Sequence, residues 1–188
     1  MVNKKRKTIN LLFLSLVLLL SGVLLGACSK ADAEDSNVDV IESVLKLQFN
    51  GPDETLMKLL QDPKYKTVVD GIEVNEEFDK YVAEVYGPYF TEFYLGTFLR
   101  MYGIHYPSSA HMSGHKLNLK NVVIQKSENA SNRYTFTATV SYARDGENEK
   151  TANVSGVVLI STKEEGKIGK FEYRDDNGLY KELSVSER

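Results

Sequence analysis

Apolar positions in the first half of the chain recur at helical spacing. A first helix is expected from about Ser36, whose hydroxyl can cap it, to a stop at Asn50-Gly51-Pro52. A second helix follows, with Asp53 in its first turn, and ends near Asp62-Pro63. The residues with helical period in these two segments are Val38, Ile41, Val44, Leu45, Gln48, Phe49, Leu56, Leu59 and Leu60.

Two further helices are predicted after a short hairpin. The segment 68–74 carries Asp70-Gly71, which suits a two-residue turn with positive φ, although a simple loop is the alternative. The third helix starts near Asn75 and is interrupted at Gly87-Pro88. The fourth is expected to bury a broad aromatic stripe against the core: Phe90, Phe93, Tyr94, Phe98, Met101 and Tyr102.

After Tyr106 the pattern changes to a period of two, which indicates strands. The apolar parity changes near Lys120-Asn121, and such a change predicts a β-bulge. Strands are expected around 117–124, 134–142, 152–160 and 168–173. Helices followed by a run of strands predict an α+β domain, with N-terminal helices packed on a curved antiparallel sheet, a four-strand meander, in a cone-like arrangement.

The N-terminal segment has the layout of a secretory signal. Lys4 to Lys7 are basic, Leu11 to Leu20 are apolar except for Ser15, and small residues follow at Gly26 and Ala27. The apolar run is short for a permanent span, which needs about 20 residues. An uncleaved anchor spanning residues 9–27 is the alternative.

Residues Leu25-Gly26-Ala27-Cys28 resemble the lipobox of bacterial lipoproteins, and Cys28 is the only cysteine of the chain. The resemblance implies cleavage before Cys28 and lipid on its sulfur. It divides the chain into a signal peptide (1–27), a lipidated Cys28 with a flexible tether (28–37) and one α+β domain (38–188). The expected location is the extracytoplasmic face of the cell membrane, which the protein contacts through the lipid on Cys28.

The net charge of the chain after the signal segment limits which classes of partner the protein is expected to bind. Of the 23 basic residues four lie in the signal segment, so the 161 residues that follow it hold 19 basic and 26 acidic residues, a net charge of −7. An acidic domain without a basic stripe argues against nucleic acid. No cofactor motif occurs, so no cofactor is predicted.

The helical segment "YVAEVYGPYFTEFYLGTFLRM" followed by strands looks like the nuclear-transport-factor-like (cystatin-like) α+β cone of many small Gram-positive lipoproteins of unassigned function. Members of that family include binding modules, assembly modules, dehydratases and isomerases. The first hypothesis is therefore a non-catalytic binding or assembly module for an unknown envelope protein or a small apolar ligand. The alternative is a small enzyme that uses an acid or a histidine inside the cone.

All three histidines, His105, His111 and His115, lie within eleven residues. Such clustering is typical of a transition-metal site. Against it, Pro107 and Gly114 predict a loop, in which a four-residue spacing does not align two imidazoles. We therefore expect a solvated loop and keep the metal site as a third hypothesis.

Aromatic residues suggest a pocket. Eight of the nineteen lie between Tyr86 and Tyr106. A buried tyrosine hydroxyl needs a partner, and a pocket rim supplies one from solvent. The sequence therefore predicts that Tyr94 and Tyr102, with Tyr134 or Tyr142 from the sheet, edge the mouth of a cavity between helix and sheet.

Overall fold

The computed structural model describes residues 35–184. The predicted signal peptide, Cys28 and the tether up to residue 34 lie outside the described residues. Helix α2 includes Ser36 and Asn37, which the sequence analysis had placed at the end of the tether. The helical elements are α2 (Ser36–Phe49), α3 (Glu54–Gln61), the 3-10 turn η1 (Pro63–Tyr65), α4 (Glu76–Val85), α5 (Glu92–Phe98), the π-turn η2 (Leu99–Gly103), α6 (His105–Ser113) and α7 (Leu179–Ser184).

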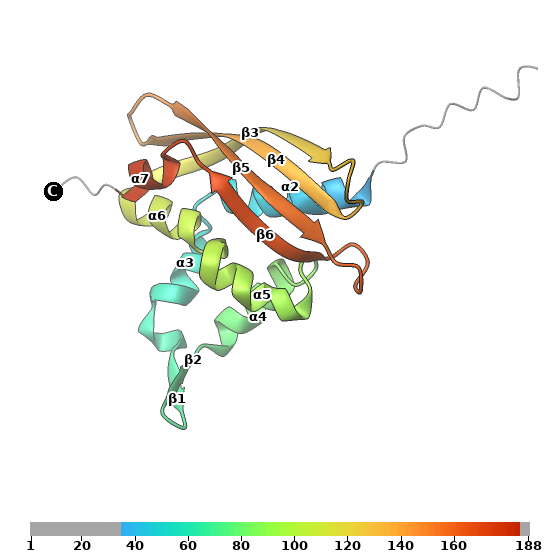
Figure 1. Ribbon diagram of the computed structural model, residues 1–188. Coiled ribbons are helices and arrows are strands. Elements are labelled where there is room, and N and C mark those ends of the chain that lie inside the picture. Colours follow the sequence, from blue (N-terminus) through green and yellow to red (C-terminus); the bar gives the residue numbers. More distant parts are fainter. Residues whose placement is uncertain (1–34, 185–188) are drawn as a thin grey trace, which may run out of the picture. The chain divides into compact units, whose positions relative to one another are not determined.

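The strands form two sheets, a small pair and a four-strand meander (Figure 1). They are β1 (Thr67–Val69), β2 (Ile72–Val74), β3 (His115–Lys126), β4 (Arg133–Arg144), β5 (Lys150–Ile160) and β6 (Ile168–Asp175). The large sheet is antiparallel throughout, in the order β3-β4-β5-β6, and it is open. The predicted α+β class and meander are confirmed. The predicted bulge is confirmed as well, since the β3–β4 register shifts between Leu119 and Asn121.

The main core lies between α2 and the inner face of the large sheet. Helix α2 contributes Ile41, Val44, Leu45 and Phe49, all without solvent exposure. Alternate residues of β4 and β5 meet them, because successive side chains in a strand point to opposite faces. These inward residues of the two central strands are Tyr134, Phe136, Ala138, Val140, Tyr142, Ala152, Val154, Val158 and Ile160.

Helices α3 and α4 form a smaller second cluster around Leu56, Met57 and Val82. Asp53 caps α3 and also accepts a hydrogen bond of 2.6 Å from the Tyr81 hydroxyl on α4, which ties the two helices together.

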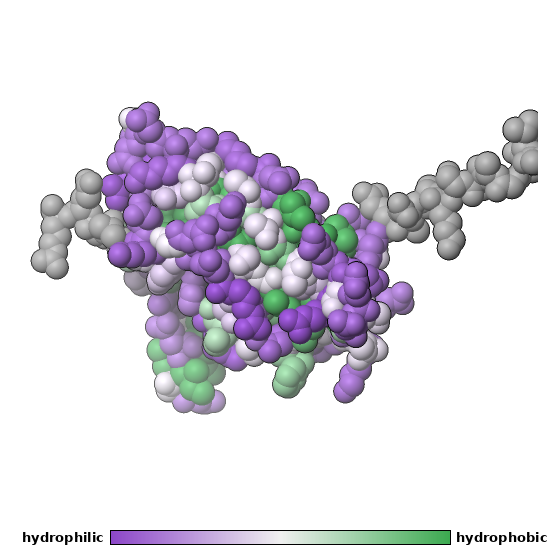
Figure 2. Space-filling view, turned by 45° about the horizontal axis from the view of Figure 1, so that its top comes forward, coloured by the Kyte–Doolittle hydropathy of each residue, from purple (hydrophilic) through white to green (hydrophobic). Residues whose placement is uncertain are grey.

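The β1–β2 hairpin projects from this cluster, away from the large sheet (Figure 1). Asp70 and Gly71 have φ of 50° and 79°, so the predicted hairpin turn is confirmed. Its apolar side chains Val68, Val69 and Ile72 are exposed. Hydrophobic colour is visible at the lower left of Figure 2, where the hairpin projects.

The predicted aromatic helix is divided, and the expectation that Phe93 belongs to the core is wrong. Thr91 caps α5 by accepting from the Tyr94 N–H, so Phe90 lies before the helix, in a segment that bridges to Ile168 of β6. Phe90 and Phe93 therefore do not share one helical face. Phe90 is buried, whereas 93% of Phe93 is exposed.

The predicted histidine loop is also wrong, because residues 105–113 form helix α6. Pro107 is the third residue of this helix, where a backbone N–H has no helical partner, so proline is tolerated there. Gly114 ends the helix in the left-handed conformation, with φ of 72°. Helix α7 was not predicted; it is six residues long and buries Leu179 and Leu183.

Both edges of the large sheet are partly covered. On β6, Ile168 donates to Tyr89 O (2.7 Å) and accepts from Thr91 N (3.1 Å). On β3, Leu117 exchanges two backbone hydrogen bonds with Gly51. The link between α2 and α3 thus occupies the start of one edge, and the link between α4 and α5 occupies the start of the other.

Candidate functional site

Two hollows meet at the junction of α6 and α7, helices that pack against each other (Figure 1). The serine hollow has a volume of about 330 Å³, and its lining residues are Ile104, His105, Ser108, Ser109, Met112, Ser113, Tyr180, Leu183 and Ser184. The aromatic hollow has a volume of about 370 Å³, and its lining residues are Met101, Tyr102, His105, Tyr106, Tyr173, Asp176 and Tyr180. His105 and Tyr180 belong to both, so the two hollows adjoin, and together we call them the groove.

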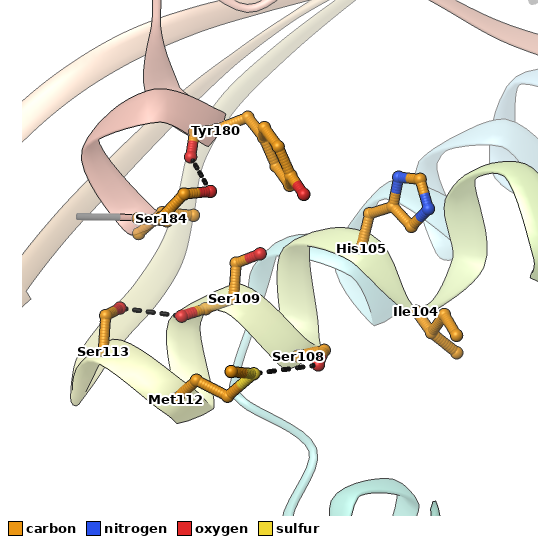
Figure 3. A pocket seen from close by; sticks show the side chains of 9 residues that line it. Ile104, His105, Ser108, Ser109, Met112, Ser113, Tyr180 and Ser184 are labelled. Atoms are coloured by element: carbon orange, nitrogen blue, oxygen red, sulfur yellow. Dashed lines mark hydrogen bonds between the residues drawn. The ribbon is translucent and has the colours of Figure 1, made fainter. Parts of the chain in front are cut away.

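Tyr180 reaches from α7 over α6, with its hydroxyl pointing toward the space between Ser109 and His105 (Figure 3). Its ring centroid lies 6.1 Å from that of His105. His105 is exposed, and Tyr180 is 46% exposed. These two rings therefore form the boundary between the hollows, and solvent reaches both of them.

Aromatic rings at steep angles surround the aromatic hollow. The Tyr102 and Tyr173 centroids are 5.6 Å apart at 85°, and those of Tyr106 and Tyr173 are 5.2 Å apart at 90°. Tyr106 and Tyr180 are 6.4 Å apart at 84°. Edge-to-face pairs of this kind are favoured by the ring quadrupoles. Tyr106 and Tyr173 also pack on Phe49 of the core, which holds this end of the hollow in place.

Asp176 supplies the acid of the aromatic hollow. Its Oδ2 accepts from the Tyr106 hydroxyl (3.1 Å) and the Tyr180 N–H (2.9 Å), and its Oδ1 accepts from the Gly178 N–H (2.9 Å). Burial, and next to it the negative charge of Asp176, raise the pKa of Tyr106 far above its usual value. Tyr106 therefore stays protonated and donates a hydrogen bond to the Asp176 carboxylate.

A buried glutamine supports the hollow from behind. Gln48 donates from Nε2 to Gly103 O (3.0 Å) and to the Tyr86 hydroxyl (3.2 Å), and its Oε1 accepts from the Tyr173 hydroxyl (3.5 Å). One side chain of α2 thus fixes the end of the π-turn η2 and a tyrosine of β6. Turns of π-helix occur frequently at functional sites, and this one places Met101 and Tyr102 at the hollow.

Ser113 and His115 form a close pair that does not have the arrangement of a nucleophile with its base. The Ser113 Oγ lies 2.7 Å from the His115 Nδ1 and also 2.7 Å from the carbonyl oxygen of Ser109. The Ser113 hydroxyl has one proton, and it donates this proton in the hydrogen bond to the Ser109 carbonyl oxygen, which can only accept. The His115 Nδ1 is therefore the donor to Ser113. The pair joins the end of α6 to β3.

The three histidines do not converge. His105 borders the groove, the His111 Nδ1 lies 3.6 Å from the Glu54 Oε2 on α3, and His115 is buried at the start of β3. Within residues 35–184 no group of three histidine, cysteine or acidic side chains is placed to hold a metal ion.

The four tyrosines of the predicted rim are not brought together at one opening. Tyr102 lines the aromatic hollow. The Tyr94 hydroxyl is bound to the backbone of Phe171 on β6. Tyr134 has no solvent exposure, so it cannot edge a mouth, and Tyr142 is 7% exposed, with its ring beside His115.

Neither Asp176 nor Tyr180 was among the site residues predicted from the sequence. The available signal was Asp176-Asn177-Gly178, an acid two residues before a glycine, followed by the apolar pair Leu179 and Leu183 at helical spacing. This pattern marks a capped helix, and a capped helix at the end of the chain brings Asp176 and Tyr180 to one site.

No family model, no curated protein and no solved structure matches this chain. No helix within residues 35–184 has the length and apolar character needed to cross a membrane.

Proposed function

We propose that this protein is a lipid-anchored extracytoplasmic binding protein whose domain takes a small ligand in the groove and does not transform it. The observation that carries the proposal is the aromatic hollow, which is open to solvent and is lined by four tyrosines from four different elements together with one carboxylate. Ligand sites are commonly concave, largely apolar, and supplied with a few polar groups that fix orientation. The α+β order supports the proposal too, since binding modules occur among proteins of the resembled cone fold.

Anchoring rests on the basic head, the apolar run and Leu25-Gly26-Ala27-Cys28. Two or more acyl chains hold a protein stably on a bilayer, because each buried methylene contributes about 0.8 kcal/mol. The test is metabolic labelling with an alkyne analogue of palmitate. Cys28→Ala is expected to abolish labelling, whereas Ser29→Ala is expected to leave it intact. Equal labelling of Cys28→Ala and the wild type would sink the anchoring proposal.

Binding in the groove is tested on the full-length protein in an uncharged polyoxyethylene detergent. A panel of choline, glucose, glycerol 3-phosphate, Ala-Ala dipeptide and 3,3-dimethylbutan-1-ol is screened by thermal shift. At least one compound is expected to raise the Tm of the wild type and of Phe93→Leu, an exposed aromatic outside the groove, but not that of Tyr180→Leu. If no compound distinguishes Tyr180→Leu from the other two proteins, the groove proposal is wrong.

A further inference from the structure

The aromatic hollow combines features that favour one class of ligand over others. Its lining includes the tyrosines Tyr102, Tyr106, Tyr173 and Tyr180, and Met101 lines it as well. The face of an aromatic ring carries negative potential and attracts a cation that lies within about 6 Å of the ring centroid. Adjacent rings stand at 84° to 90° to one another, so the tyrosines enclose the space from several directions.

The charge of the hollow also favours a cation. Asp176 is the carboxylate in the lining, and its oxygens are held by Tyr106, Gly178 and Tyr180. Neither lysine nor arginine is among the described residues that line the hollow. A negative group fixed among aromatic rings, with neither lysine nor arginine in the lining to neutralise it, repels anions and attracts cations.

We propose that the aromatic hollow is a cage for a small alkylated ammonium group, such as the trimethylammonium group of choline. This proposal rests on the proposed function, because it assigns a ligand class to the same groove. A quaternary ammonium donates no N–H hydrogen bond, so ring faces and a nearby carboxylate are the partners that suit it. The volume of about 370 Å³ accommodates such a group with its short chain.

Tyr180 is the residue of the cage at which the contribution of the ring can be tested apart from that of the hydroxyl. It is half exposed, and the hydrogen bond that it donates to the Asp176 carboxylate comes from its backbone N–H and not from its side chain. Tyr180→Phe keeps the ring face, whereas Tyr180→Leu removes it. Asp176→Asn removes the charge and keeps one side-chain oxygen, which can still accept from the Tyr180 N–H and cap α7, although the amide nitrogen cannot accept from the Gly178 N–H.

The test is isothermal titration of the full-length protein with choline and with its uncharged carbon analogue 3,3-dimethylbutan-1-ol. Choline is expected to bind at least about tenfold more tightly than the alcohol, since the faces of well-placed aromatic rings attract the cation and not its uncharged analogue. Tyr180→Leu and Asp176→Asn are expected to weaken choline binding by about tenfold, and Tyr180→Phe and the control Phe93→Leu by less than about twofold. Titration with phosphocholine separates a phosphorylated headgroup from the free amine: tighter binding of either than of the alcohol supports the cage.

Two results overturn the cage and differ in what they imply for the groove. If the alcohol or glucose binds as tightly as choline and Tyr180→Leu abolishes that binding, the groove binds a neutral ligand and only the cation assignment is wrong. If neither choline nor phosphocholine gives heat at 10 mM, the cage is wrong, and the thermal-shift panel decides separately whether the groove binds anything else.

Discussion

The hydroxyl group of Tyr94 on α5 occupies the place of a neighbouring strand beside Phe171 of β6. It donates to the Phe171 carbonyl oxygen at 2.8 Å and accepts from the Phe171 N–H at 3.0 Å. One side chain thus satisfies both backbone groups of an edge residue. Burial raises the pKa of Tyr94, so its hydroxyl stays protonated and can make both hydrogen bonds.

Tyr94→Phe is expected to destabilise the fold by about 1–3 kcal/mol, because it leaves the half-buried N–H and C=O of Phe171 without their partner. Urea unfolding measures the change. The matched control is Tyr89→Phe, whose hydroxyl has no hydrogen bond among the described residues and which should change stability by less than about 0.5 kcal/mol. A neutral Tyr94→Phe would show that water replaces the hydroxyl at this edge.

Phe98→Ala is expected to cost about 3–5 kcal/mol, because Phe98 is fully buried and stacks on Phe90 at 4.2 Å between centroids. Phe93→Ala, one and a half helical turns away on the same helix, is expected to change stability by less than about 0.5 kcal/mol, because its ring lies in solvent. Thermal unfolding of the two variants side by side checks the orientation of α5. A larger loss for Phe93→Ala would mean that α5 is rotated relative to this structure.

Gly156→Ala is expected to destabilise the sheet by about 1–3 kcal/mol or to prevent folding, because a methyl group there overlaps the Phe136 ring and the Glu172 carbonyl oxygen. Gly169→Ala in β6 is the control, since its added carbon meets Ser161 at an ordinary 3.6 Å. Soluble yield and the urea midpoint are the measurements. Equal stability of the two variants would contradict the close approach at Gly156.

His115 is expected to make the fold less stable in mild acid. Burial first, and then the positive charge of Arg144, lower its pKa below the usual 6.5; Lys150 acts in the same direction, and Glu147 and Glu182 oppose it. The unfolded chain therefore binds a proton at a higher pH than the folded chain does. The contribution of His115 to stability is complete above about pH 6.5 and is lost as the pH falls from 6.5 through the folded pKa.

This pH dependence is measured as the free energy of unfolding at pH 7.5 and pH 5.5. In the wild type the value should fall between these two conditions, and in His115→Gln the fall should be smaller. His105→Gln, which replaces an exposed histidine, should behave as the wild type does. An identical fall in His115→Gln would assign the effect to other groups.

The sequence predicted best those elements whose side chains alternate between core and solvent. The inward rows of β4 and β5, the bulge at 119–121 and the apolar face of α2 follow from periodicity alone, because burial on one face fixes that periodicity. The sequence predicted least well where one local interaction decides at which residue a helix begins, and therefore which residues share a helical face. The cap at Thr91 starts α5 after Phe90, and no apolar pattern records this start.

The groove could not be derived from the sequence because its residues come from three separate segments. Tyr102 and Tyr106 precede the sheet, Tyr173 lies at its last strand, and Asp176 and Tyr180 follow it. Their meeting depends on α7 returning over α6, a helix that Pro107 made look like a loop. Neither event has a local signature strong enough to place these side chains together.

The covered edges have a consequence for how copies of the protein behave at high local concentration. A bare strand edge recruits strands from other molecules, which leads to aggregation. Here Gly51 already pairs with Leu117, and Tyr89, Thr91 and the Tyr94 hydroxyl already pair with β6. At these positions a neighbouring molecule would have to displace an intramolecular partner before its strand could join, so crowding does not readily convert the sheet into a template for oligomers.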